Sequence, residues 1–230
     1  MKRKTPEEVV REIFFDNEKF ARAKGREFFE AHIEAQSPVI TLVTCSDSRV
    51  HPTVFSEKLI DRVFVIRNIG NQIESSAGSV DYGVIHLQTP VLLILGHVNC
   101  GAVKAFLKGY ADESPFIRNE LNHLCIPVSP FKGEGNFEVA WREAVESNVH
   151  WQVRVALERY GLLIRRNRLA VIGAIYDFAN YYGRGFGRIV VVNVNGIRER
   201  EALLKHRALS LLPEELRREV VVLEHHHHHH

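Results

Sequence analysis

The sequence predicts an α/β protein with a mostly parallel, open β-sheet of four parallel strands plus an edge strand, flanked by helices. Three observations support this prediction. Short runs rich in valine and isoleucine are apolar throughout, as strands covered on both faces are. Segments with helical spacing alternate with these runs. The 230 residues, 45% of them hydrophobic, suffice for a substantial core in one such domain.

The first 35 residues are expected to form an N-terminal helical arm. Between Thr5 and Ala35 the apolar residues recur at helical spacing, which indicates one or two amphipathic helices. The phenylalanines of this arm are expected to pack in the core or against a partner subunit. The α/β catalytic domain then spans 36–222, and residues 223–230, LEHHHHHH, read as an expression tag without functional meaning.

The elements of the α/β domain follow one another in a regular order. The strands are expected at 39–44, 62–67, 91–96, 169–177 and 187–196. A crossover helix is expected over 75–88, with Ser75 or Ser76 near its N-cap, and a short helix after Gly101. Residues 109–136 hold several prolines and glycines and are expected to be irregular, before a long helix over 137–160.

The composition argues against several classes of partner. A net charge of +2 without blocks of lysine and arginine does not favour nucleic-acid binding. The longest apolar run, PVLLILG, is too short to span a bilayer, and the charged N-terminus does not resemble a secretion signal, so we expect a cytoplasmic protein. Three cysteines cannot build a disulfide framework, which leaves metal binding or chemistry as their uses.

Two short stretches carry candidate chemistry, TCSDSR at 44–49 and GHVNCG at 96–101. Each begins where a predicted parallel strand ends, and ligands gather at the carboxyl ends of such strands. Cys45, His97 and Cys100 can therefore converge, and two cysteines with one histidine are the ligands of a catalytic zinc site whose fourth position is open.

A structural zinc site is the alternative, but it would need a fourth ligand, and Cys125 has no neighbouring ligand residue. For Cys125 itself we expect an idle thiol. A phosphatase loop with a cysteine nucleophile fits less well, because five residues separate the cysteine from the arginine in such loops, whereas three residues separate Cys45 from Arg49.

Asp47 and Arg49 stand beside the first candidate ligand. The Asp47 carboxylate can accept a hydrogen bond from a zinc-bound water, and Arg49 can hold that carboxylate ionised through a two-pronged pair. The alternative is a solvated ion pair on a loop.

With these motifs, the chain resembles the β-class carbonic anhydrases, zinc enzymes that hydrate carbon dioxide to bicarbonate. The resemblance rests on CSDSR at 45–49, HVNC at 97–100 and RNIGN at 67–71, and it is strong over 36–108. It implies one Zn²⁺ per subunit and a zinc-bound hydroxide as nucleophile. A second candidate activity, hydrolysis of carbon disulfide or carbonyl sulfide, shares this scaffold, and a non-catalytic zinc- or bicarbonate-binding scaffold is a third reading.

The resemblance also implies a substrate pocket. Gln36 matches an amide that hydrogen-bonds substrate, and Phe64 and Tyr82 match the apolar pocket wall. In many members these residues come partly from the neighbouring subunit, which implies a homo-oligomer with the dimer as its minimal unit, or a tetramer. The Gly101 N–H, at the start of a helix, is placed to stabilise developing oxyanion charge.

Two further features concern regulation and proton release. His51 is a candidate proton shuttle, with buffer as the alternative. Some members close the zinc site with the aspartate, linked to bicarbonate beside a tryptophan three residues before the first cysteine. Leu42 occupies that position here, so we expect the open, water-bound form.

Overall fold

The computed structural model describes residues 3–222, so the expected tag at 223–230 lies outside the described residues. By its internal contacts the chain separates into two compact units, residues 1–37 and 38–230. The division expected from the sequence, an arm of residues 1–35 and a catalytic domain of 36–222, stays a prediction. The two units are described separately.

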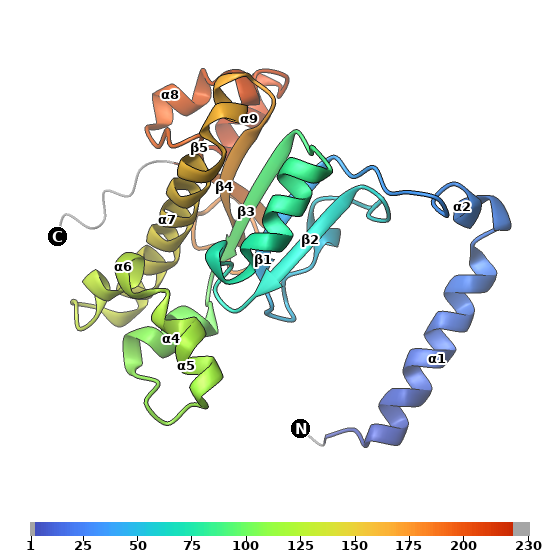
Figure 1. Ribbon diagram of the computed structural model, residues 1–230. Coiled ribbons are helices and arrows are strands. Elements are labelled where there is room, and N and C mark those ends of the chain that lie inside the picture. Colours follow the sequence, from blue (N-terminus) through green and yellow to red (C-terminus); the bar gives the residue numbers. More distant parts are fainter. Residues whose placement is uncertain (1–2, 223–230) are drawn as a thin grey trace. The chain divides into compact units, whose positions relative to one another are not determined.

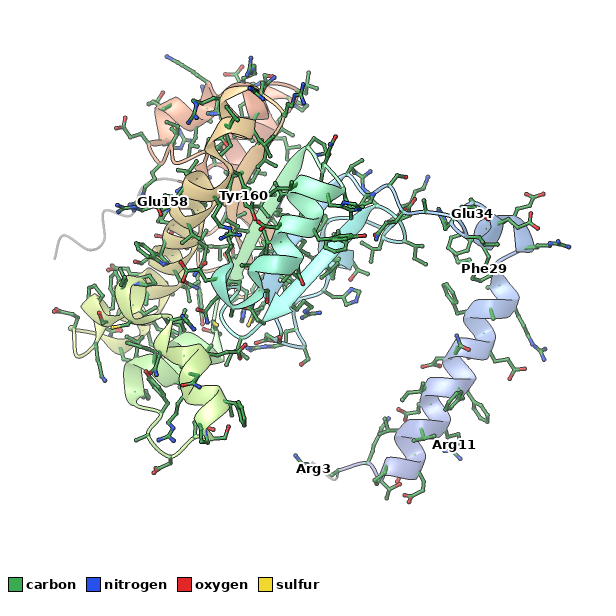
Figure 2. The ribbon with its side chains drawn as sticks, in the orientation of Figure 1. Arg3, Arg11, Phe29, Glu34, Glu158 and Tyr160 are labelled. Carbon is green, nitrogen blue, oxygen red and sulfur yellow. The ribbon has the colours of Figure 1, made fainter. Side chains whose placement is uncertain are left out.

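The first unit consists of α1 (Pro6–Ala23) and α2 (Arg26–Glu30). A capping box begins α1, in which the Thr5 hydroxyl accepts from the Glu8 backbone N–H and the Glu8 carboxylate accepts from the Thr5 N–H. Phe20, Phe28 and Phe29 form an edge-on cluster, with Phe29 labelled in Figure 2. Neither helix has a buried residue, so the two helices alone form no core.

The second unit is built on one five-stranded sheet in the order β2-β1-β3-β4-β5 (Figure 1). Its strands are β1 (Ile40–Cys45), β2 (Val63–Asn68), β3 (Val91–His97), β4 (Ala170–Asp177) and β5 (Arg188–Val194). The first four are parallel and β5 runs antiparallel along the edge next to β4. The predicted fold class, four parallel strands plus an edge strand, is confirmed.

The strand order places the end of β1 at a topological switch point. From β1 the chain passes to β2 on one side of the sheet, and then to β3 on the other side of β1. The connections that leave the carboxyl ends of β1 and β3 therefore diverge, and a crevice forms between them, as in other doubly wound sheets. Cys45 and His97 are the last residues of these two strands.

Helices cover the sheet and most of them are short. The longer ones of the second unit are α4 (Gly101–Lys108), α5 (Pro115–Asn122), α7 (Phe137–Arg165) and α9 (Glu214–Val220), and the short ones are α3 (Ala77–Asp81), α6 (Cys125–Val128) and α8 (Arg200–Leu204). Single turns lie at η1 (Pro52–Val54), η2 (Glu74–Ser76), η4 (Ser129–Phe131) and η5 (Arg207–Leu209), and η3 (Tyr82–His86) is a π-helical turn. Among the described helices none is long and apolar enough to cross a membrane.

The long helix α7 lies along β3 and β4 (Figure 1). It continues to Arg165, beyond the predicted end at residue 160, with a kink at Tyr160 where the backbone leaves the helical region. The Tyr160 hydroxyl, labelled in Figure 2, donates to Asp81 at 2.6 Å, and Arg159 donates to the same oxygen at 2.8 Å. Burial, together with the bond to Asp81, raises the pKa of Tyr160 to about 12, so the phenol stays a donor that ties α7 to α3.

One segment differs from its predicted form. Residues 109–136 are not irregular throughout, because they contain α5 and α6, and α5 begins with an N-cap bond from Ile117 N–H to the Ser114 hydroxyl. The crossover segment 75–88 is helical as predicted, with α3 continuing without a break into the π-helical turn η3. Ser76 does precede α3, but its hydroxyl accepts from the Asn68 amide at 3.0 Å instead of capping the helix.

Close packing of α7 on β4 depends on Gly173. A Cβ at this position would lie 2.9 Å from side-chain carbons of both Val149 and Val153, which are themselves fully buried. We expect Gly173→Ala to lower the free energy of unfolding by about 1–3 kcal/mol, because neither the helix nor the strand can yield without loss of packing. Urea unfolding measures this. Gly78→Ala is the matched control, since a Cβ there meets nothing within 4 Å, and a loss there as large as at Gly173 would contradict this explanation.

Candidate metal centre

Three potential metal ligands meet at the switch point. Cys45 ends β1, His97 ends β3, and Cys100 is the N-cap residue of α4. The turn from β3 into α4 is short because Asn99 adopts a left-handed conformation (φ 58°), which asparagine tolerates better than most residues. The Sγ atoms of the two cysteines and a ring nitrogen of His97 lie within 4.8 Å of one another, and all three residues are buried.

The His97 ring is oriented so that one nitrogen is left without a partner. Nδ1 lies 2.8 Å from the carbonyl oxygen of Val98, and because a carbonyl only accepts, Nδ1 carries the proton. Nε2 then presents its lone pair, and it is buried without a hydrogen-bond partner in the described part of the chain. Such an orphaned acceptor is costly in a protein interior, whereas a backbone carbonyl on the opposite nitrogen is the usual support of a metal-binding imidazole.

The two thiols are electrostatically linked. A hydrogen bond from Cys100 lowers the pKa of Cys45 to about 4 against the opposing effect of burial, and His97 lowers it further. The same bond to Cys45, together with burial, raises the pKa of Cys100 well above its usual value. The opposite directions of these shifts mean that the two sulfurs oppose each other's ionisation, which a bound cation would favour for both.

Asp47 and Arg49 form a two-pronged pair beside this cluster. The guanidinium donates through Nε to Oδ1 at 3.0 Å and through Nη2 to Oδ2 at 2.6 Å, and the Arg49 backbone N–H donates to Oδ1 at 2.8 Å. These bonds lower the pKa of Asp47 to about 2, so the carboxylate is ionised at neutral pH. Its Oδ2 lies 3.8 Å from His97 Nε2, within reach of any group bound there.

Arg67 shapes the loop that carries these residues, a role that its sequence position did not reveal. From β2 its side chain donates to three backbone carbonyl oxygens of the loop: to Cys45 at 3.0 Å, Asp47 at 2.7 Å and Val50 at 2.6 Å. A guanidinium has donors enough to satisfy a turn of backbone that strands and helices cannot satisfy. RNIGN was noted only as part of a resemblance, because no local pattern indicates such long-range bonds.

Phe178 contacts two residues of the site, and its role was also not evident from the sequence. The Arg49 guanidinium lies 4.8 Å from the centre of its ring, and the His97 ring is stacked on it at 6.3 Å. The buried Asp177 carboxylate holds the following turn by accepting backbone N–H bonds from Ala179, Tyr181 and Tyr182. An aspartate that ends a strand before a glycine-rich turn was the available signal.

Of the remaining predicted residues, Gly101 directly follows Cys100, whereas Phe64 and Tyr82 are not gathered at the cluster within one chain. Phe64 and Tyr82 stack at 5.7 Å, but Phe64 pairs with Thr41, four residues before Cys45, which is roughly 13 Å along the strand. The Gly101 N–H stands at the first turn of α4.

The sequence also singled out a possible substrate-binding amide, a possible proton shuttle and a third cysteine. Gln36 belongs to the first unit and is exposed, and its position relative to the cluster is not defined. His51 is exposed, and its Nδ1 accepts from the Thr53 N–H at 3.3 Å. Cys125 is an exposed free thiol on α6.

Comparison with known proteins gives consistent results. The family model described as carbonic anhydrase matches residues 40–184. A carbonic anhydrase from Synechocystis is 29% identical over 185 residues, which are 66% of this chain and 66% of the relative, just under two thirds of its length.

Two solved structures show the same fold. A Coccomyxa β-carbonic anhydrase in complex with acetazolamide is 26% identical, with a TM-score of 0.67 over 82% of this chain and 88% of the other. A tetrameric β-carbonic anhydrase from Sordaria macrospora is 22% identical and supports the fold, with a TM-score of 0.70 over 81% and 98%. From the family match, the shared fold and the clustered cysteine and histidine residues, the chain belongs to the carbonic anhydrase family, in its β class.

Proposed function

We propose that this protein catalyses the zinc-dependent, reversible hydration of carbon dioxide to bicarbonate and a proton. The observation that carries this proposal is the buried cluster of Cys45, His97 and Cys100 with the Asp47–Arg49 pair beside it. A cluster that only stabilised the fold would have no use for an ionised carboxylate within 4 Å of its histidine. Family membership supports the same activity.

The donor set of the cluster suits one Zn²⁺ per subunit. Two thiolates and a neutral imidazole are ligands that zinc accepts readily, and the orphaned His97 Nε2 lacks only such a partner. When bound, zinc would supply a Lewis acid that makes water a nucleophile near neutral pH. The first-turn N–H groups of α4 favour the thiolate form of Cys100, which is the form that binds a metal.

The chain's own residues would orient the reactants. Asp47 accepts a hydrogen bond from the attacking water and thereby directs its lone pair, while Arg49 keeps that carboxylate ionised and fixed. Because Arg49 engages both carboxylate oxygens, we propose the open form, in which Asp47 is not a metal ligand. The Gly101 N–H would stabilise negative charge that develops on the substrate oxygen. His51 or buffer would carry the proton away.

The substrate pocket is proposed to be completed by a second subunit. Phe64 and Tyr82 form an apolar wall that lies too far along β2 to reach the cluster of the same chain. Tyr82 is 44% exposed, so its ring is accessible to a neighbour. We therefore propose a homo-oligomer, a dimer or a tetramer like the Sordaria relative, in which Gln36, Phe64 and Tyr82 contact carbon dioxide at a subunit boundary.

Stopped-flow hydration of carbon dioxide tests the proposed activity. We expect turnover that rises with pH in the alkaline range. Two thiolates nearly cancel the charge of the metal, so a water bound to it would lose its proton at a higher pH than a water on a metal held by neutral ligands. Turnover of carbonyl sulfide is measured in parallel. A zinc-loaded protein that is inactive on carbon dioxide at alkaline pH, or that turns over carbonyl sulfide alone, would contradict the proposal.

Phe178 is expected to act as a positioning residue for Arg49. Phe178→Ala removes the ring that lies against the guanidinium and the His97 imidazole, which should lower kcat/KM about 3- to 10-fold with zinc content unchanged. Phe186→Ala is the matched control, because Phe186 lies in the same turn region and is 77% exposed. Equal activity of the two variants would exclude the positioning role, and rescue by Phe178→Tyr would support it.

A further inference from the structure

A cavity lies on α7, apart from the metal centre. It has a volume of about 450 Å³ and lies between α6, the middle of α7 and the turn that follows β5. None of the three candidate metal ligands lines it, nor do Asp47 and Arg49. Its size is within the range of sites that bind small molecules.

A partly buried hydrogen-bond relay fixes the polar wall of this cavity. The Gly196 N–H donates to Asn193 Oδ1 at 2.8 Å, and the Asn193 amide donates from Nδ2 to His150 Nδ1 at 2.9 Å. With Nδ1 as the acceptor, the neutral His150 ring carries its proton on Nε2 and offers an N–H donor. Burial, and next the positive charge of Arg198, lower the pKa of His150 to about 4 against the opposing negative charge of Glu146, so the ring is neutral at physiological pH.

The turn after β5 is held tightly against α7. Gly196 adopts a left-handed conformation (φ 91°), and a Cβ at that position would lie 2.8 Å from Leu157 Cδ1. This close approach places Arg198, two residues further on, near enough to His150 to affect its titration. The position of Arg198 at the cavity is therefore set by the fold of the turn.

The cavity combines positive charge with an apolar wall. Arg198 and Arg154 both line it, and none of the described residues that line it carries a carboxylate. Arg154 lies against the Trp151 ring and pairs loosely with Glu158 outside the cavity, whereas Arg198 has no hydrogen bond or ion pair with any residue that the structure describes. An arginine at a concave surface without a counter-charge is a site for an anionic group.

Apolar side chains also line the cavity and form its apolar wall, among them Ile126, Leu157 and Trp151. A bare inorganic anion would make no use of this surface, which would stay in contact with water. From the relay, the unpaired guanidinium and this wall, we propose that the cavity binds a small monocarboxylate with an apolar body. The carboxylate accepts from Arg198 and from His150 Nε2–H, and the body lies against the apolar wall.

Calorimetric titration of the zinc-loaded protein with benzoate tests this proposal. We expect saturable binding that Arg198→Glu weakens at least about tenfold, since the variant replaces a charge-assisted donor by a like charge. Arg165→Glu, at the exposed end of the same helix, is the matched control and should leave binding unchanged. Benzamide, which has the same ring without the charge, should bind at least about tenfold more weakly.

The metal centre is a competing site for a carboxylate, and Cys45→Ala distinguishes the two. Benzoate binding that survives Cys45→Ala and is lost in Arg198→Glu supports the cavity. Binding that disappears with Cys45, or is unaffected by Arg198→Glu, overturns the proposal, as does a parent protein that does not bind benzoate. Inorganic phosphate that binds as tightly as benzoate would contradict a role for the apolar wall.

Discussion

Replacing Cys45 with alanine is expected to remove zinc from the protein and to lower carbon dioxide hydration by at least about 1,000-fold. The reason is the small number of ligands. With Cys45 absent, the two remaining donors are His97 Nε2 and the Cys100 thiol, and burial still opposes ionisation of that thiol. Zinc content by elemental analysis and stopped-flow hydration measure the two effects.

Cys125→Ala is the matched control for this experiment. It removes the same thiol group from an exposed position on α6, so both zinc content and activity should match the parent. A Cys45→Ala protein that keeps stoichiometric zinc and full activity would show that the metal is held elsewhere. A loss of zinc in the Cys125 variant would contradict the three-residue ligand set.

Replacing Asp47 with alanine is expected to lower kcat/KM by about 100- to 1,000-fold while zinc is retained. The carboxylate would no longer direct the attacking water, but no proposed metal ligand is lost. Arg49→Ala should have a smaller effect in the same direction, because Asp47 then keeps its charge but loses two of the three hydrogen bonds that it accepts from Arg49. The stopped-flow assay and elemental analysis again supply the readouts.

The double variant shows whether Asp47 and Arg49 act as a unit. If Arg49 works only through Asp47, the double variant should be no less active than Asp47→Ala alone. Asp112→Ala, at an exposed position outside the site, is the control and should be as active as the parent. Unchanged activity of Asp47→Ala would end the orienting role proposed for this carboxylate.

The convergence of the three candidate metal ligands at the switch point could be predicted, because it follows from two local sequence patterns. Apolar runs end at TCSDSR and at GHVNC, and the carboxyl ends of neighbouring parallel strands meet at one edge of the sheet. The two side chains that hold the site in place could not be predicted in this way. Arg67 reaches across from another strand to backbone carbonyls, and Phe178 comes from a turn far along the chain.

The segment 109–136 was predicted to be irregular because of its prolines and glycines, and this prediction was wrong for α5 and α6. Proline was read as a breaker of helices, but Pro115 occupies the first turn of α5, where its missing N–H costs nothing, and Ser114 caps the helix before it. The kink of α7 at Tyr160 had no local signal in the sequence. It coincides with the hydrogen bond from Tyr160 to Asp81, which lies 79 positions away in the sequence.

An anomalous-scattering crystal structure at the zinc edge, from crystals grown at alkaline pH, would identify the atoms that hold the metal. We expect one zinc per subunit, bonded to the sulfurs of Cys45 and Cys100 and to His97 Nε2, with a solvent molecule as fourth ligand and Asp47 still paired with Arg49. A zinc bound elsewhere, or a fourth protein side chain that occupies the solvent position under these conditions, would contradict this expectation.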